Sequence, residues 1–255
     1  MSIQQNASPP PTEPNAPLVQ HLVELRNRLL YILAALLLVF IALLNFANDI
    51  YTYVAAPLQK FLPNGASMIA TEVASPFLTP FKLTFFVAFI ISVPFIFYQV
   101  WGFLAPGLYR HEKKLIAPLI ISSVLLFYAG IAFAYFVVFP LVFGFFTSMA
   151  PEGVTVMTDI GSYLDFVLKL FVAFGVAFEI PIATVLVIRS GMVSADSLVN
   201  KRPYVIVSCF VIGMFLTPPD AISQLLLAVP MWLLFEAGLF LGKRVNVQSD
   251  GEVST

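Results

Sequence analysis

Two carboxylates stand among basic residues, in polar segments that border apolar stretches of the chain. Glu24 lies within residues 21–28 (HLVELRNR), and Glu112 lies within residues 99–114 (QVWGFLAPGLYRHEKK), which also contain Phe103. A carboxylate forms bidentate hydrogen bonds with a guanidinium, and an aromatic ring stacks on it, in ways that lysine does not match. We therefore hypothesise that these two segments bind the guanidinium groups of a ligand.

The first of these segments also has a simpler interpretation. Leucines recur at helical spacing, at positions 18, 22, 25 and 29, and predict an amphipathic helix that lies along the inner membrane surface. Glu24 and Arg28 are four residues apart on that helix, so they can form an ion pair worth only about a few tenths of a kcal/mol. On this interpretation the segment is an interfacial anchor.

A second kind of polar residue lies inside the apolar stretches. Glu179 occurs in the sequence FEIP (178–181), and a carboxylate in a lipid-facing helix costs at least about 2.5–3.5 kcal/mol. Glu179 is therefore expected to face protein or a water-filled recess, or to be protonated, and Pro181 frees a carbonyl nearby. A helix-packing hydrogen bond and a functional role explain it equally well. Glu236, near the inner end of its apolar stretch, is expected to extend toward water.

The patterns for nucleotide and metal chemistry are incomplete. Gly242-Lys243 resembles part of a phosphate-binding loop, but the first glycine and the serine or threonine of that pattern are both replaced. His111-Glu112 begins a zinc-protease pattern in which the second histidine position is Leu115. We expect no enzyme activity, no metal site and no cofactor. A net charge of −1 gives no overall attraction to nucleic acid.

The composition places most of the chain in a membrane. Apolar residues make up 60% of the chain and charged residues 11%, with a mean hydropathy of +0.93, which is more apolar surface than a soluble core can bury. A bilayer core about 30 Å thick requires roughly 20 apolar residues per helix. We predict an all-α membrane protein with six transmembrane helices, near residues 29–47, 76–103, 115–143, 161–188, 204–217 and 221–241.

The last two predicted helices are short. Pro203 and the sequence TPP (217–219) confine the fifth, and the paired prolines force a tight reversal into the sixth. These two helices are expected to form a hairpin that thins the bilayer locally. Gly238 and Gly242 in the sixth have the spacing of a helix-contact motif, which is also common by chance.

Basic residues predict the orientation. Ten of the 13 flank the spans on one side, which is cytoplasmic by the positive-inside rule, so both termini are predicted to be cytoplasmic. Residues 1–17 are predicted to be a disordered, proline-rich tail, 18–244 the six-span domain and 245–255 a C-terminal tail. The outer loop 48–75 has a helical pattern interrupted at Pro57, and is predicted to form a periplasmic cap.

Several motifs occur together and in one order along the chain. They read HLVELR (21–26), SPF (75–77), YQVWGFLAPGL (98–108), FEIP (178–181), KRPY (201–204) and LTPPD (216–220). With Glu112 and the number of spans, they make residues 18–244 resemble the TatC subunit of the twin-arginine protein translocase. The resemblance implies a multi-pass protein of the cell inner membrane, of proteobacterial type.

The resemblance also implies a receptor for folded precursor proteins. Such a subunit works in a multimeric complex with a single-span TatB-type partner, binds signal peptides that carry two consecutive arginines, and recruits TatA-type subunits for export driven by the proton-motive force. Its signal-peptide-binding positions correspond to Glu24, Arg26, Phe103 and Glu112, and its intramembrane glutamate to Glu179. Positions implicated in partner contact or structure correspond to Pro57, Thr217, Asp220 and Gln224.

Two other functions compete with this reading on the sequence alone. A proton-coupled secondary transporter of a small cationic solute would use Glu179 as its intramembrane carboxylate, although the chain lacks the internal repeats of many transporters. A membrane scaffold would need no polar site, and the carboxylates Glu24 and Glu112 argue against it.

Overall fold

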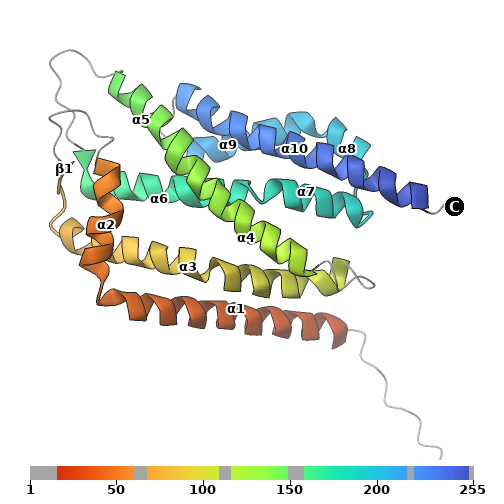
Figure 1. Ribbon diagram of the computed structural model, residues 1–255, viewed down its shortest axis with the longest axis horizontal. Coiled ribbons are helices and arrows are strands. Elements are labelled where there is room, and N and C mark those ends of the chain that lie inside the picture. The colour runs from red at the N-terminus through yellow and green to blue at the C-terminus, as the bar shows by residue number, and fades with distance from the viewer. Residues whose placement is uncertain (1–15, 60–67, 109–115, 149–157, 217–220, 253–255) are drawn as a thin grey trace, which may run out of the picture.

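The computed structural model of the 255-residue chain describes residues 16–59, 68–108, 116–148, 158–216 and 221–252. Long helices run side by side along the longest axis of the molecule, and the described chain starts and finishes at the same end of the bundle (Figure 1). That end carries most of the described basic residues and is called the basic end below; the opposite end, where the helix around residue 50 lies, is called the cap end.

The first long helix, α1 (Ala16–Leu44), is continuous from the basic end to the cap end. The expectation of a separate helix on the membrane surface is therefore wrong, because the leucine stripe continues in phase into the apolar stretch and nothing after Pro17 interrupts it. The predicted first span reached residue 47, but α1 ends three residues earlier, at a turn that leads into the cap.

The next two spans are α3 (Ser75–Leu108) and the composite helix α4 (Ile116–Phe133), η2 (Ala134–Val138) and α5 (Phe139–Ser148). The wide turn η2 has its cause in Pro140, whose ring clashes with the carbonyl four residues back. The Phe139 amide bonds instead to the Ala134 carbonyl, five residues back, and this widened turn lets the span pass the proline without ending.

The fourth span is divided into α6 (Ile160–Ala177) and α7 (Ile180–Arg189). Phe178 and Glu179 separate them, because Pro181 lacks the amide that would continue the helix. After the short α8 (Ala195–Asn200) follow α9 (Arg202–Leu216) and α10 (Ala221–Glu252).

The six apolar helices agree with the prediction, and the fifth is short. Within the described residues, five helices are long and apolar enough to cross a membrane, whereas α9 has 15 residues and extends only about 22 Å. The apolar part of the sixth spans 21 residues, Gln224–Arg244, but α10 itself continues beyond the predicted end at residue 241 to Glu252. The short fifth span is thus confirmed, while the sixth helix is longer than expected.

The cap end combines α2 (Ala47–Gln59) with two short strands, β1 (Met68–Ile69) and β2 (Thr158–Asp159). The strands pair in parallel, Met68 with Thr158 and Ile69 with Asp159, and they are a small departure from an all-α fold. Helix α2 packs on α3 and runs through position 57, so the predicted interruption at Pro57 is wrong. The predicted cap is present.

Asp159 ties the cap to the fourth span. Its Oδ2 accepts a hydrogen bond from the Ser162 amide at 2.8 Å and so caps α6, while its Oδ1 accepts from the Thr71 amide at 3.0 Å and the Thr71 hydroxyl at 2.8 Å. These hydrogen bonds hold the pKa of the Asp159 carboxyl well below its usual range. Thr71 lies between β1 and α3, so one carboxylate joins three segments of the cap end.

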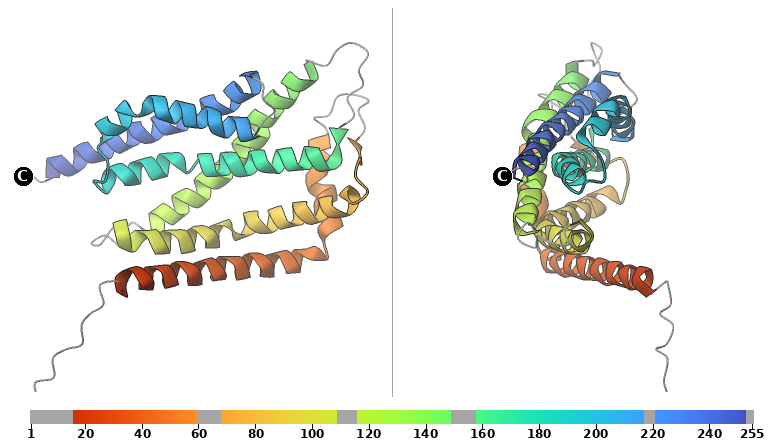
Figure 2. Two further views of the ribbon diagram at one scale, coloured as in Figure 1. Left: turned by 180° about the vertical axis from the view of Figure 1, so that it is seen from behind. Right: turned by 90° about the vertical axis from the view of Figure 1, so that its right-hand side faces the viewer.

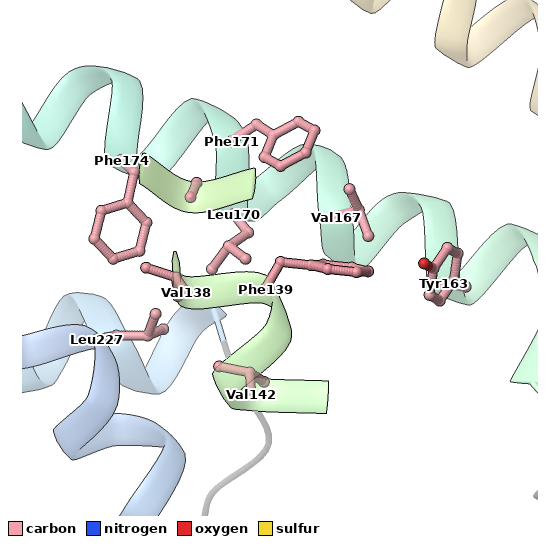
Figure 3. Close-up of a cluster of buried hydrophobic side chains, with 10 residues drawn as sticks. Val138, Phe139, Val142, Tyr163, Val167, Leu170, Phe171, Phe174 and Leu227 are labelled. Carbon is pink, nitrogen blue, oxygen red and sulfur yellow. The ribbon is translucent and has the colours of Figure 1, made fainter. Parts of the chain in front are cut away.

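The main core lies where the third span crosses the fourth. Val138 and Phe139 lie against a row of side chains on α6 that includes Val167, Leu170 and Phe174, and Val142 and Leu227 complete the cluster (Figure 3). The two further views show the third span running obliquely across the other long helices (Figure 2). The widened turn η2 therefore sets which side chains of this span reach the core.

Candidate functional site

A guanidinium joins α1 to α3 at the basic end. Arg28 donates from Nε and Nη2 to Oε1 of Glu24, at 2.9 and 2.7 Å, and from Nη1 to Oε1 of Gln99 at 3.2 Å and the Gln99 carbonyl at 3.4 Å. The ion pair between Glu24 and Arg28 was predicted from spacing and is confirmed. Gln99, which is 71 residues from Arg28, was missed because nothing in the local pattern signals so distant a contact.

Gly102 makes room for this guanidinium. A Cβ atom at that position would lie 2.6 Å from Nη1 of Arg28, which is closer than real Cβ atoms come, and 3.3 Å from its Cζ, which is a tight contact. Gln99 and Gly102 are three residues apart on α3 and so face α1 together. The sequence signal that could have revealed this contact is therefore a small residue one turn after a polar one.

Next to this joint, α1 and α3 enclose a depression of about 470 Å³. Its lining is polar and aromatic except for one valine, and consists of Gln20, Val23, Glu24, Asn27, Arg28, Tyr31, Tyr98 and Gln99. Both hydrogen bonds on Glu24 fall on Oε1, and its side chain is 43% exposed, so the carboxylate can accept further bonds from a ligand. Tyr31 and Tyr98, exposed rings of the lining, were not predicted as site residues.

An aromatic pair makes a second link between the same helices. The rings of His21 and Phe103 stack with their centroids 4.2 Å apart and an angle of 13° between their planes. The structure thus brings Phe103 into the same α1–α3 joint as Glu24. Glu112, the other predicted carboxylate, lies outside the described residues.

Arg26 does not share the depression with Glu24. Two residues apart on a helix, their side chains point to different sides. The Arg26 guanidinium donates to Oδ1 of Asn27, from Nη2 at 3.1 Å and from Nε at 3.3 Å, and both groups are exposed. Asn27 itself lines the depression, so Arg26 lies at its edge.

Glu179 faces the interior of the protein, where α6 gives way to α7. Its atom Oε1 is buried and makes no hydrogen bond within the described part of the chain, while its carboxylate interacts with the hydroxyl of Ser123 on α4. The same hydroxyl accepts a 2.9 Å hydrogen bond from the indole Nε1 of Trp101 on α3. Three spans are therefore connected by a short polar chain of Trp101, Ser123 and Glu179.

Glu236 is held by an ion pair rather than extended toward water. Arg202, at the start of α9, donates from Nη2 to Oε2 of Glu236 at 2.6 Å, and the Glu236 side chain is only 24% exposed. The sequence indicates only a carboxylate able to reach water, and the structure adds its partner, a cation 34 residues away. This pair joins α9 to α10 at the basic end.

The remaining predicted positions lie away from the depression. Pro57 lies in α2 at the cap, and Gln224 lies in the first turn of α10, where its backbone approaches Gly213 of α9. Thr217 and Asp220 fall outside the described residues. None of the described residues form a group of three or more histidine, cysteine or acidic side chains that could bind a metal ion.

Helices α7 and α10 meet through the glycine spacing noted in the sequence. A Cβ atom on Gly238 would lie 2.7 Å from the Cα of Pro181, and Gly242 packs against Ile188. The motif that could have been a chance pattern is therefore a true helix contact. It fixes the fourth span, and with it Glu179, against the last one.

The fold and this geometry define a class of protein: a six-helix membrane protein whose polar, ligand-sized site lies at the basic end of the bundle. The chain also matches the family model for the Sec-independent protein translocase protein (TatC) over residues 20–230, and so it belongs to this family. It is a membrane component of a protein translocase and not an enzyme.

Individual relatives agree with this assignment. The chain is 63% identical to the Sec-independent protein translocase protein TatC of Azotobacter chroococcum over 96% of both chains, and 60% identical to that of Escherichia coli K12 over 91% of this chain and 90% of the other. A crystal structure of the twin-arginine translocase receptor TatC superposes with a TM-score of 0.80, at 39% identity, over 89% of this chain and 99% of that one. The family assignment favours translocation over solute transport as the function.

Proposed function

We propose that this chain binds the twin-arginine signal peptides of folded precursor proteins, at the depression between α1 and α3. The observation that carries the proposal is that Glu24 already binds one guanidinium there, that of Arg28, through a single carboxylate oxygen. The surroundings suit a second guanidinium, because Tyr31 and Tyr98 offer rings on which a planar cation stacks.

In this proposal Glu24 bridges two cations. Arg28 keeps Oε1, and one arginine of the signal peptide bonds to Oε2, so the resident guanidinium orients the carboxylate for the incoming one. The second arginine is bound by Glu112 from the connection between α3 and α4. Phe103, fixed by its stack on His21, and Arg26, at the edge of the depression, border the path of the peptide.

The proposal extends to the orientation and to the other subunits. The basic end faces the cytoplasm of a cell inner membrane, which places both termini inside, as its excess of lysine and arginine favours. A TatB-type subunit shares the receptor role, and TatA-type subunits join for export driven by the proton-motive force. The pair of helices α9 and α10, with Thr217, Asp220 and Gln224, is the region that contacts these single-span helices, and the shortness of α9 supports this part of the proposal.

A binding experiment tests the central step. Full-length protein in nanodiscs is titrated with a fluorescent signal peptide carrying two arginines, and with the same peptide carrying two lysines. Glu24→Gln removes one charge-assisted bond from a partly exposed site, so affinity for the arginine peptide should fall about tenfold, or about 1.4 kcal/mol. The matched control is Asp196→Asn, an acid at the same end whose side chain is 93% exposed, which should leave affinity unchanged.

The lysine peptide should bind to the wild type more weakly than the arginine peptide. In Glu24→Gln the difference in affinity between the two peptides should be smaller. Wild-type affinity in Glu24→Gln, in Glu112→Gln and in the double variant would falsify the proposal.

A further inference from the structure

An apolar groove opens between α4, α7 and α10, away from the α1–α3 depression. It has a volume of about 440 Å³, and its walls include Leu119, Leu126, Pro181, Val185, Leu186 and Leu241. The one hydroxyl in the lining, that of Ser122, already donates to the Leu119 carbonyl at 3.0 Å. The body of the groove therefore offers an occupant almost nothing but hydrocarbon.

The groove runs along one leaflet of the bilayer. Helix α4 begins at the basic end and α7 finishes there, so the lining from Pro118 to Leu126 and from Arg189 to Pro181 leads from that end toward the middle of the membrane. Each stretch has nine residues, and the eight rises between its ends extend about 12 Å. Half of a hydrocarbon core about 30 Å thick is about 15 Å, which is close to the same length.

The chemistry of the lining suits an acyl chain. Apart from Ser122, whose hydroxyl is already bonded within its own helix, and Arg189 at the basic end, the walls are apolar. A flexible hydrocarbon chain can follow these walls while its headgroup stays at the basic end.

One cation lines the groove at the basic end, called its mouth below, and a second lies close by in sequence on α10. Arg189 belongs to the lining, and Arg244 lies one turn beyond Leu241, with its guanidinium 4.4 Å from the centre of the Phe240 ring. Lysine and arginine at the membrane surface attract anionic lipid headgroups. The apolar walls and the cationic mouth therefore complement the two parts of one molecule.

We infer that this groove is a binding site for an anionic phospholipid of the leaflet at the basic end. One acyl chain lies along α4 and α7, and the phosphodiester bonds to Arg189 at the mouth. The acyl chain then fills the gap between the third, fourth and sixth spans, next to the glycine contact of α7 and α10. This inference does not depend on where the signal peptide binds.

Native mass spectrometry of the purified full-length protein tests the inference, with phosphatidylglycerol and phosphatidylcholine of identical acyl chains as probes. The wild type should retain phosphatidylglycerol in preference. Arg189→Gln should reduce that preference about fivefold, the effect of one basic residue near the surface. Val185→Trp fills the groove and should remove tightly bound lipid of both kinds. The matched control Lys169→Gln removes an exposed cation from α6, far from the mouth, and should change nothing.

Two results would overturn the inference. One is an unchanged preference for phosphatidylglycerol in Arg189→Gln, which stands even if Val185→Trp fails to fold. The other comes from a photoreactive amino acid at position 185 in cell membranes: attachment to another protein subunit, instead of to lipid, would show that a protein occupies the groove.

Discussion

The close approach of Gly102 to Arg28 makes a quantitative prediction about the α1–α3 joint. In Gly102→Ala the new Cβ would lie 2.6 Å from Nη1, so the guanidinium must move away from α3. Movement in that direction breaks the bonds from Nη1 to Gln99, which are already long at 3.2 and 3.4 Å. The helix backbone does not have to shift, because the obstructing atoms are at the end of a flexible side chain.

The expected magnitude follows from two opposing terms. A hydrogen bond from a charged donor contributes about 1.5–3 kcal/mol at good geometry, but these two are long and share one donor, so we expect a loss of about 1 kcal/mol. Replacing glycine by alanine in a helix gains up to about 1 kcal/mol. Gly102→Ala should therefore leave the free energy of unfolding nearly unchanged.

A matched glycine substitution separates the loss of the Arg28–Gln99 hydrogen bonds from the gain in helix propensity. A Cβ on Gly144 in α5 would meet nothing within 4 Å, so Gly144→Ala should show the helix gain alone, and the two variants should differ by about 1 kcal/mol. The assay is unfolding by sodium dodecyl sulfate in mixed micelles, followed by circular dichroism. In an Arg28→Ala background Gly102→Ala should become as stabilising as Gly144→Ala. Equal effects of the two substitutions in the wild-type background would refute the reasoning.

Three further substitutions test other parts of the structure by the same unfolding assay. Ser123→Ala leaves the buried indole of Trp101 without its acceptor and should cost about 1–3 kcal/mol, while Ser122→Ala, whose hydroxyl bonds only within its own helix, should be nearly neutral. Gly238→Ala forces a Cβ against the backbone of Pro181 and should cost about 1–3 kcal/mol, and wild-type stability would contradict the glycine contact. For Asp159 the folded pKa lies below the unfolded one, so its contribution to stability is complete above the unfolded pKa of about 4 and declines as the pH falls below it. Asp159→Asn should thus lower the midpoint of thermal unfolding at pH 6 and reduce the drop in that midpoint on acidification to pH 3. An unchanged drop would argue against a stabilising role for the Asp159 hydrogen bonds.

Local patterns predicted what depends on near neighbours in the chain. Hydropathy located all six apolar helices, prolines bounded the short fifth span, and four-residue spacing gave the ion pair of Glu24 with Arg28. Each of these features is set by residues within a few turns of one another. The same pattern misled at the start of α1, where amphipathic spacing suggested a surface helix although the stripe continues unbroken into the span.

Contacts between distant segments could not be predicted in this way. Gln99 meets Arg28 and Arg202 meets Glu236 because particular helices lie side by side, and neither partner carries a periodic signal of the other. The glycines at 238 and 242 were visible, but only the packing against Pro181 shows that their spacing has a use. The depression was predicted in part. Glu24 was identified from the sequence, whereas Tyr31 and Tyr98 were recognised as site residues only in the structure.

The most direct test of the central claim is to find where a twin-arginine peptide lies on this chain. A photoreactive phenylalanine analogue is placed at Tyr98, an exposed ring in the depression, or at Phe136, an exposed ring of the third span outside it. Full-length protein in membranes is then irradiated with the labelled peptide. The account predicts attachment at position 98, its loss when the peptide carries lysines, and none at position 136. Equal attachment at both positions, or attachment at position 98 that is unchanged when the peptide carries lysines, would contradict binding in the depression.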